Sequence, residues 1–330
     1  MKLDNVNFFR GELMEIKAGN QKPKSYFREL NILLALIILC IFITIMNPKF
    51  VTPFNLQVVA RQIAIYGLIA IGETLIIIGG GIDLSVGSLV ALTGVLVALF
   101  MKNGMDMMVA ILAVLIISCL IGLWHAFFVT KLKVPPFIIT LGTLTAARGL
   151  ASVITKGWPI IGLPEKFFFI GQGDLWGIPF PTIILIIFAI LAFFITKYTV
   201  LGRNLYAVGG NIEAARLSGI DVDKVRIFTY IFGSFLAGIT GIIIASRLSQ
   251  GQAGVGGGYE LSAIAAAVIG GTSLSGGEGT ILGTIIGASI MSVIYNGLIL
   301  LEISSYWHDV VMGLVIVTAV TIDIWRKRKR

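Results

Sequence analysis

Charged residues are scarce in this sequence. Asp, Glu, Lys and Arg make up only 13 % of its 330 residues, whereas hydrophobic residues make up 57 %. Soluble domains carry about 25 % charged residues, so this deficit excludes an ordinary soluble globular protein. Apolar runs of about 17–25 residues recur along the chain, which is the length that crosses a bilayer as a helix. We therefore predict an all-α polytopic membrane protein.

The residues of metal, redox and nucleotide chemistry are also scarce. Cys40 and Cys119 both lie in apolar runs and are interpreted as small packed residues, without a disulfide or metal framework. His125 and His308 are far apart, so no metal site is expected. The chain has no G-x-x-x-x-G-K-[ST] and therefore no P-loop for a nucleotide. Nothing resembles G-x-S-x-G, which disfavours a membrane-embedded hydrolase, and we expect neither a bound cofactor nor enzymatic activity.

The apolar runs predict about ten transmembrane helices. The segment 261–269 is too short to cross unless its flanking glycine-rich loops join it. This organisation divides the chain into an N-terminal segment over 1–29, a membrane domain over 30–325 and a basic tail over 326–330. The predicted spans are Leu30–Met46, Leu56–Ile78, Leu84–Met101, Met107–Thr130, Phe137–Thr155, Thr182–Thr196, Ile227–Ser246, Leu261–Ile269, Thr280–Leu301 and Tyr306–Trp325.

Positive charge predicts the orientation. The net charge of +8 is spread over short loops and ends, so it indicates membrane orientation and not nucleic-acid binding. With ten spans and a cytoplasmic N-terminus, the cytoplasmic segments hold eighteen Lys and Arg residues and the outer segments hold five. This places both ends and Lys197–Arg226 in the cytoplasm. A re-entrant 261–269 would move the basic tail outside, so a crossing is favoured. The first 29 residues lack a signal-peptide pattern, and the first span is expected to direct insertion.

The polar interval Lys197–Arg226 contains a predicted short helix with marked ends. Asn211 can cap its N-terminus, and Glu213 lies in the first turn, where the helix dipole favours negative charge. Gly219 can adopt the left-handed conformation that ends a helix, and Asp221 can cap the next one. A helix of about eight residues spans roughly 12 Å and is unstable alone. It must therefore dock on another surface.

Two glycine-rich stretches share a pattern. Residues 80–87 and 270–277 both fit G-G-x-x-L-S-x-G. Transporters often contain duplicated halves with interrupted segments at matching positions. A chain with 39 glycines also produces such matches by chance. Both explanations stay open.

Ionisable residues in or next to the predicted spans are informative, because a charge in hydrocarbon is costly. They include Arg61, Glu73, Asp83 and Arg148, and the last three are candidates for the translocation path. A structural role is favoured: Arg148 could neutralise Glu73, and Asp83 follows three glycines and could cap the third span. An ion-coupled secondary transporter would place paired carboxylates in mid-span, and only Glu73 is clearly there. This class is therefore disfavoured.

The loop 156–181 is rich in Gly, Pro and aromatic residues. Trp158, Trp176 and Phe180 are typical of anchors at the membrane surface. They equally suit a docking surface for a partner outside the cell, and the sequence does not separate the two.

One family shares several long stretches with this chain. Glu213-Ala214-Ala215, followed three residues later by Gly219, resembles the E-A-A-x-x-x-G signature of permease subunits of ATP-binding cassette importers. Further stretches are similar to the sugar-importing branch of these permeases, and the likeness runs from about Pro48 to the end. They are Gly80–Leu92, Leu201–Ile220, Tyr259–Gly279 and Asn296–Leu298.

The resemblance implies a function and partners. Two permease copies would form a pathway in the cytoplasmic membrane of a bacterium, a cytoplasmic ATPase would bind the ATP, and a binding protein outside would deliver the sugar. The implied sugar is ribose, with another pentose, galactose or autoinducer-2 as alternatives. The short helix would be the coupling helix that contacts the ATPase. The implied coupling residues are Asn211, Glu213, Ala214, Ala215 and Gly219.

Overall fold

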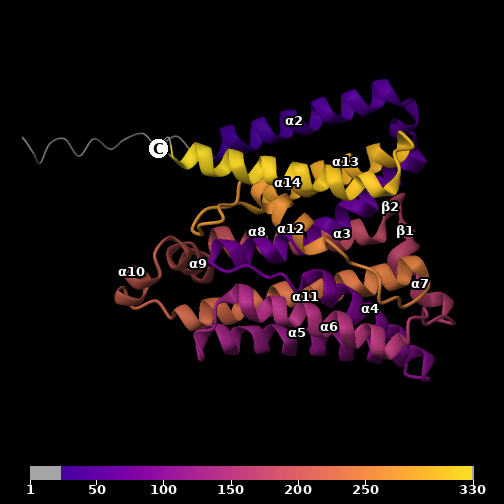
Figure 1. The fold of residues 1–330 in the computed structure, drawn as a ribbon, viewed down its shortest axis with the longest axis horizontal. Coiled ribbons are helices and arrows are strands. Elements are labelled where there is room, and N and C mark those ends of the chain that lie inside the picture. The colour runs from indigo at the N-terminus through magenta and orange to yellow at the C-terminus, as the bar shows by residue number, and fades with distance from the viewer. Residues whose placement is uncertain (1–23, 329–330) are drawn as a thin grey trace, which may run out of the picture.

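The computed structural model describes residues 24–328 as a bundle of helices (Figure 1). All ten predicted spans are helical, which confirms the all-α class. Most of the predicted segment 1–29 and the end of the tail lie outside the described residues. The ten helices are α2 Lys24–Met46, α3 Pro53–Ile78, α4 Val86–Lys102, α5 Met107–Thr130, α6 Pro136–Thr155, α8 Phe180–Tyr198, α11 Val222–Leu248, α12 Tyr259–Ile269, α13 Ile281–Leu300 and α14 Ser305–Arg328.

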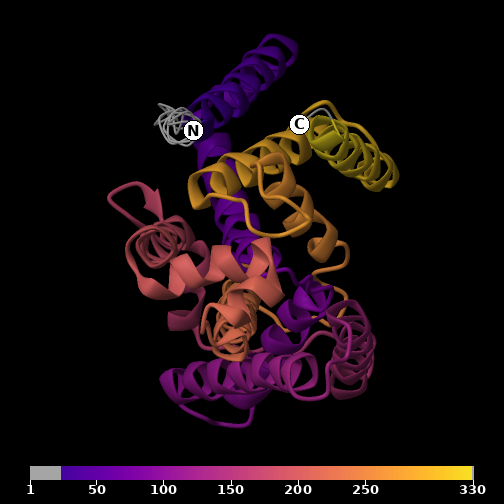
Figure 2. The same ribbon diagram turned by 90° about the vertical axis from the view of Figure 1, so that its left-hand side faces the viewer.

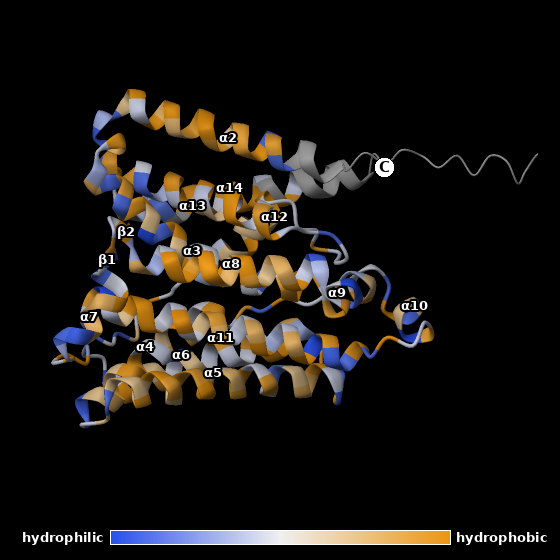
Figure 3. Cartoon of the chain, turned by 180° about the vertical axis from the view of Figure 1, so that it is seen from behind, coloured by the Kyte–Doolittle hydropathy of each residue, from blue (hydrophilic) through white to orange (hydrophobic). Residues whose placement is uncertain are grey.

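The ten helices differ in length. Seven of the described helices are long and apolar enough to cross a membrane, namely α2, α3, α5, α6, α8, α11 and α13. The apolar parts of α4, α12 and α14 are shorter. The hydropathy colouring shows mainly apolar residues along the helices and polar residues gathered at both ends (Figure 3). This banding fits a bilayer around the middle of the bundle.

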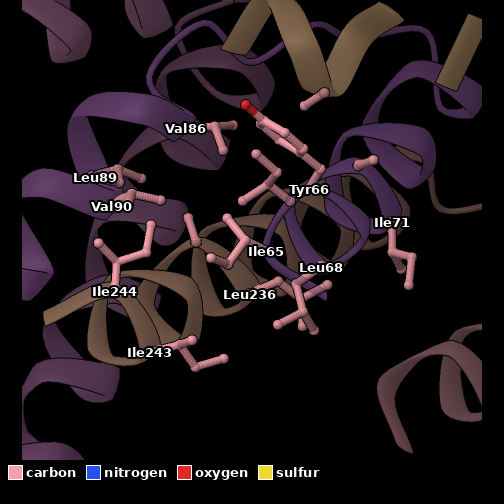
Figure 4. Packing of buried hydrophobic residues seen from close by; sticks show 14 of the residues in the cluster. Ile65, Tyr66, Leu68, Ile71, Val86, Leu89, Val90, Leu236, Ile243 and Ile244 are labelled. Carbon is pink, nitrogen blue, oxygen red and sulfur yellow. The ribbon is translucent and has the colours of Figure 1, made fainter. Parts of the chain in front are cut away.

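The core of the bundle lies between α3 and α11. In α3, 83 % of the most apolar window is buried, whereas in α2 only 6 % is. Ile65 and Leu68 of α3 pack with Leu236 and Ile243 of α11, beside residues of α4 (Figure 4). These helices have apolar residues on all sides because they are surrounded by protein, whereas α2, α5, α6 and α8 form an outer layer.

The two ends of the bundle carry different elements. At one end lie α9 (Val200–Gly210) and α10 (Ile212–Leu217), which face the viewer in Figure 2. The first helix begins and the last helix ends at this same end (Figure 1), which agrees with an even number of crossings. The sequence did not predict α9. The opposite end carries η1 (Pro48–Val51), α7 (Glu165–Gln172) and the hairpin strands β1 (Asp174–Leu175) and β2 (Ile178–Pro179).

The tip of the hairpin explains its register. Asp174 pairs with Pro179 and Leu175 with Ile178, which leaves a two-residue turn. Both turn residues have positive φ, 53° for Trp176 and 80° for Gly177, as a type I′ hairpin turn requires. Trp176 is 96 % exposed, so the hairpin holds an aromatic ring clear of the bundle.

Residues 251–277 pass from one end of the bundle to the other. Gly251 exchanges two backbone hydrogen bonds with Ile160 near α7, and the Gly277 amide donates to the Ile78 carbonyl near α9 (2.9 Å). The 11 residues of α12 cover only about 16 Å, so the flanking loops complete the crossing. This agrees with the crossing that the charge distribution favoured.

The two glycine-rich stretches form similar helix ends. At the end of α3, Gly80 has φ +78° and the Gly81 amide donates to the Ile76 carbonyl. At the end of α12, Gly271 has φ +99° and the Thr272 amide donates to the Ala267 carbonyl. Both are Schellman-type ends. In this geometry Gly80 corresponds to Gly271, whereas in the sequence pattern it corresponds to Gly270. Beyond the caps the paths differ, and the duplication stays a hypothesis.

Candidate functional site

The helix α10 has the caps that the sequence predicts. The Asn211 side chain accepts a hydrogen bond from the Ala214 amide at 3.0 Å. At the other end Gly219 has φ +80°, its amide donates to the Arg216 carbonyl, and the Ile220 amide donates to the Ala215 carbonyl. This pair of bonds is the Schellman motif, which a residue without Cβ adopts most easily. The helix has six residues, slightly fewer than predicted.

The two faces of α10 differ in exposure. Ala215 is buried, and Ile212 and Ile220 pack against the main core of the chain. On the outer face Glu213 pairs with Arg216 at 3.2 Å, and Leu217 is 90 % exposed. The apolar side chain of Leu217 is left in contact with water, and a partner surface that covered it would gain favourable apolar burial. The helix is thus fixed from within and presents a mixed polar and apolar face outward.

A groove of about 290 Å³ runs beside α10. Its walls include Ile212 and Glu213 of α10 and Pro135 of the turn after α5. Lys131 in this turn pairs with Asp223 of α11 at 2.9 Å, and this hydrogen bond raises the pKa of the Lys131 ammonium group. The turn and the start of α11 are thereby joined beside the exposed helix.

The start of α11 is also capped as predicted. The Asp221 side chain accepts a hydrogen bond from the Lys224 amide at 3.1 Å. This bond, together with the Lys224 side chain at 3.1 Å, lowers the pKa of the Asp221 carboxyl group. The predicted caps on both sides of Gly219 are confirmed.

Two of the three predicted path residues lie together deep in the bundle. Glu73 and Asp83 are both buried, and the Asp83 amide donates to Glu73 Oε1 at 3.2 Å. Asp83 Oδ2 lies 3.8 Å from Nδ1 of the buried His125, whose ring faces Tyr230 with 6.0 Å between centroids. The sequence analysis considered His125 only as a metal ligand together with the distant His308, so its place beside Asp83 was not predicted. Burying three such polar side chains is costly unless they contact one another or other polar groups.

Asp83 does not cap α4 itself, which corrects the expectation for this residue. Ser85 occupies the cap position, and its own amide and hydroxyl donate to Asp83 Oδ1 at 2.7 and 2.6 Å. Asp83 therefore orders the turn before the helix. The helix begins at Val86, two residues after the predicted start at Leu84, so Asp83 lies outside the cap position.

Arg148 lies apart from the two acids. Its guanidinium Nη1 donates to the carbonyls of Ala253 (3.2 Å) and Val255 (2.6 Å) in the glycine-rich loop before α12. The predicted neutralisation of Glu73 by Arg148 is therefore wrong. The position of Arg148 within a predicted span did not show which loop would pack against α6.

A further cavity, of about 310 Å³, was not predicted from the sequence. It lies among α3, α11, α12, α13 and α14, and its polar side chains come from four of them. Tyr259 and Asn296 lie in stretches that carry the family resemblance. This was the one feature of the sequence that pointed to the residues of the cavity. The polar and aromatic lining residues are Gln62, Tyr66, Arg247, Tyr259, Ser262, Tyr295 and Asn296.

Comparisons with known proteins identify the family of the chain. A family model described as "Branched-chain amino acid transport system / permease component" matches residues 55–320. The ribose import permease protein of Bacillus subtilis is 45 % identical over 88 % of this chain and 91 % of that protein. The ribose import permease protein of Haemophilus influenzae is 41 % identical over 96 % of this chain and all of that protein.

A relative with a different named substrate is less similar. The xylose transport system permease protein of Haemophilus influenzae is 32 % identical over 89 % of this chain and 95 % of that protein. No solved structure gives a significant match. The predicted resemblance to import permeases is confirmed, and the chain belongs to the permease-component family of branched-chain amino acid transport systems.

Proposed function

We propose that this chain is the membrane-spanning subunit of an ATP-driven importer that carries ribose across the cytoplasmic membrane of a bacterium. The observation that carries the proposal is the identity of 41–45 % with ribose import permeases over most of the chain. A relative in Escherichia coli, 39 % identical, is named as a probable ABC transporter permease. The second candidate is another monosaccharide, because xylose and D-allose permeases are also similar, at 32 % and 37 % identity.

The α9–α10 end is the proposed cytoplasmic end, with α10 as the coupling helix. Asn211 and Gly219 fix its ends, Ala215 anchors it inward, and Glu213, Ala214 and the exposed Leu217 are available to a groove on the ATPase. The ATP would be bound by that subunit, and this chain would make no covalent change to the sugar. Both termini would then be cytoplasmic, in agreement with the charge distribution.

The remaining partners are a second copy of the chain and a sugar-binding protein outside. The exposed rings of Trp158 and Trp176 lie in the segment 156–181, at the end opposite α10. They suit contact with lipid headgroups or with the binding protein. Glu73, Asp83 and Arg148 remain candidates for the path, each with a structural contact that already accounts for its position.

Reconstitution tests the proposal directly. Proteoliposomes that contain this chain, its ATPase and its binding protein should accumulate ribose only with ATP on the ATPase side. Gly219→Val should reduce this uptake and ATPase association, because a β-branched residue is strained at φ +80° by about 1–2 kcal/mol. The matched control is Gly210→Ala, where an added Cβ has nothing within 4 Å.

Two outcomes would reject the proposal. Uptake that survives without ATP and collapses with the ion gradient would indicate a secondary transporter. Normal uptake and full ATPase association in Gly219→Val, with Glu213→Trp equally unaffected, would remove α10 from coupling.

A further inference from the structure

The cavity of about 310 Å³ has a preformed polar lining. Arg247 Nη1 donates to Gln62 Oε1 at 3.3 Å, which joins α11 to α3 in the wall of the cavity. Asn296 and Asn55 exchange two side-chain hydrogen bonds of 2.9 and 3.0 Å, and both are buried. These bonds orient the amide groups before any ligand arrives. Preformed orientation of this kind is typical of small-molecule sites.

Aromatic rings form the other part of the lining. Tyr66 and Tyr259 meet edge to face with 5.3 Å between their centroids, and Tyr295 contributes a third ring from α13. Tyrosine combines an apolar ring face with a hydroxyl group that donates and accepts. A sugar has the complementary surface, with C–H groups on the faces of its ring and hydroxyl groups around the edge.

Charge and size narrow the ligand class. Among the described lining residues Arg247 is charged and none is acidic, which disfavours a cationic ligand. The volume is at the lower limit of the roughly 300–1,000 Å³ range of small-molecule pockets. The donors and acceptors are amide, guanidinium and hydroxyl groups, which pair with ligand hydroxyls in either direction.

The position of the cavity suits entry from the outer side. Arg247 lies in the last turn of α11, and Gln62 lies in the first half of α3. Both belong to the part of the bundle near α7, where the Gln172 side chain donates to the Arg247 carbonyl at 3.2 Å.

We propose that this cavity is a monosaccharide site within the permease chain itself, with Gln62, Arg247 and Tyr259 as direct ligand contacts. This inference rests on the proposed function for the identity of the sugar and deepens it.

Thiol protection tests the site on the full chain in nanodiscs, without the ATPase. Ser262 lines the cavity, whereas its neighbour Leu261 is 48 % exposed and lines no part of it. In a background with Cys40→Ala and Cys119→Ala, D-ribose should slow the reaction of Ser262→Cys with a methanethiosulfonate reagent. The reaction of Leu261→Cys should not change. Equal rates with and without D-ribose at Ser262→Cys would overturn the proposal.

Ligand contacts are tested by saturation-transfer NMR on the same nanodiscs with D-ribose. Gln62→Leu and Tyr259→Ala should weaken binding at least about fivefold, the effect of losing roughly one hydrogen bond. The matched control Tyr306→Ala, which changes an exposed tyrosine outside the cavity, should bind normally. Binding of ribose 5-phosphate without binding of D-ribose would make this an anion site and overturn the assignment, as would unaltered binding in both cavity variants.

Failure of the proposed sugar site can be distinguished from failure of the proposed importer function. Ribose protection at Ser262→Cys without ATP-driven uptake would reject the importer and keep the site. Uptake by the reconstituted importer without protection would reject the site and keep the importer. The thiol assay does not depend on whether Gln62→Leu or Tyr259→Ala folds, because the proteins used in that assay retain Gln62 and Tyr259.

Discussion

The α10 helix and the interior around α4 hold their polar groups in opposite ways. At α10, Asn211 and Gly219 satisfy the helix ends with partners within five residues, in contact with solvent. In the interior, Glu73, Asp83 and His125 come from separate elements and are fully enclosed. The first region can change without moving the bundle, whereas the second depends on the relative positions of α3, α5 and the turn before α4. We expect substitutions to separate these two behaviours.

The largest expected effect lies at the contact between α12 and α13. A Cβ added at Gly287 would collide with the backbone carbonyl of Ala266. Gly287→Leu must therefore push the helices apart and should cost about 3 kcal/mol or more in free energy of unfolding, since overpacking costs about 1–3 kcal/mol even with relaxation. Denaturant titration in detergent measures it. Gly142→Leu, where nothing lies within 4 Å, should have little effect, and equal losses in both would contradict this packing.

Removal of the Asp83 carboxylate should have the next largest effect. Asp83→Ala leaves the amide and hydroxyl of Ser85 without their acceptor in a buried site. A buried donor left without an acceptor costs about 1–3 kcal/mol, and we expect a loss of about 2 kcal/mol in the same titration. Asp83→Asn retains an acceptor and should lose less. Equal losses would show that the charge, and not the turn, is what matters.

Removal of the α10 cap should have a smaller and local effect. Asn211→Ala deletes the acceptor for the Ala214 amide and should cost about 1 kcal/mol of helix stability. Hydrogen exchange should quicken across 212–217 and stay unchanged in α3. Protection lost throughout the bundle would show that α10 is not an independent region.

The smallest expected effect concerns pH at the start of α11. The Lys224 amide lowers the pKa of Asp221, so the ionised carboxylate stabilises the folded chain at pH values above the unfolded pKa of about 3.9. That contribution is lost as the pH falls through the lower folded pKa. Asp221→Asn retains a good cap, so its midpoint of unfolding should lie slightly below that of the unaltered chain at about pH 7, and the difference should shrink as the pH falls below about 3.9. A difference in midpoint between the two proteins that grows as the pH falls would contradict this prediction.

Local signals account for what the sequence predicted well. The caps at Asn211, Gly219 and Asp221 depend on residues within a few positions, and the spans depend on continuous apolar runs. The helix α9 was missed because Val200–Gly210 is short and ends in two glycines. Gly209 is there because a side chain would collide with the Ile78 carbonyl, a contact that no local pattern shows.

Long-range contacts account for what the sequence did not predict. Arg148 binds carbonyls about a hundred residues away, and the two acids meet His125 instead of this arginine. The tyrosines of the cavity are spread over α3, α12 and α13, so their proximity exists only in the folded bundle. Residue type identified the two acids and Arg148 as unusual, and packing determined their partners.

The isolated position of α2 has a consequence for biosynthesis. The helix packs chiefly on α13, and the Asn47 side chain that follows it donates to the Leu300 carbonyl, 253 residues later in the chain. At a synthesis rate of about 5–20 residues per second, α2 would wait roughly 13–50 s in the membrane before its neighbour emerges from the ribosome. A surface that is apolar on nearly every side allows α2 to remain in lipid alone during that interval.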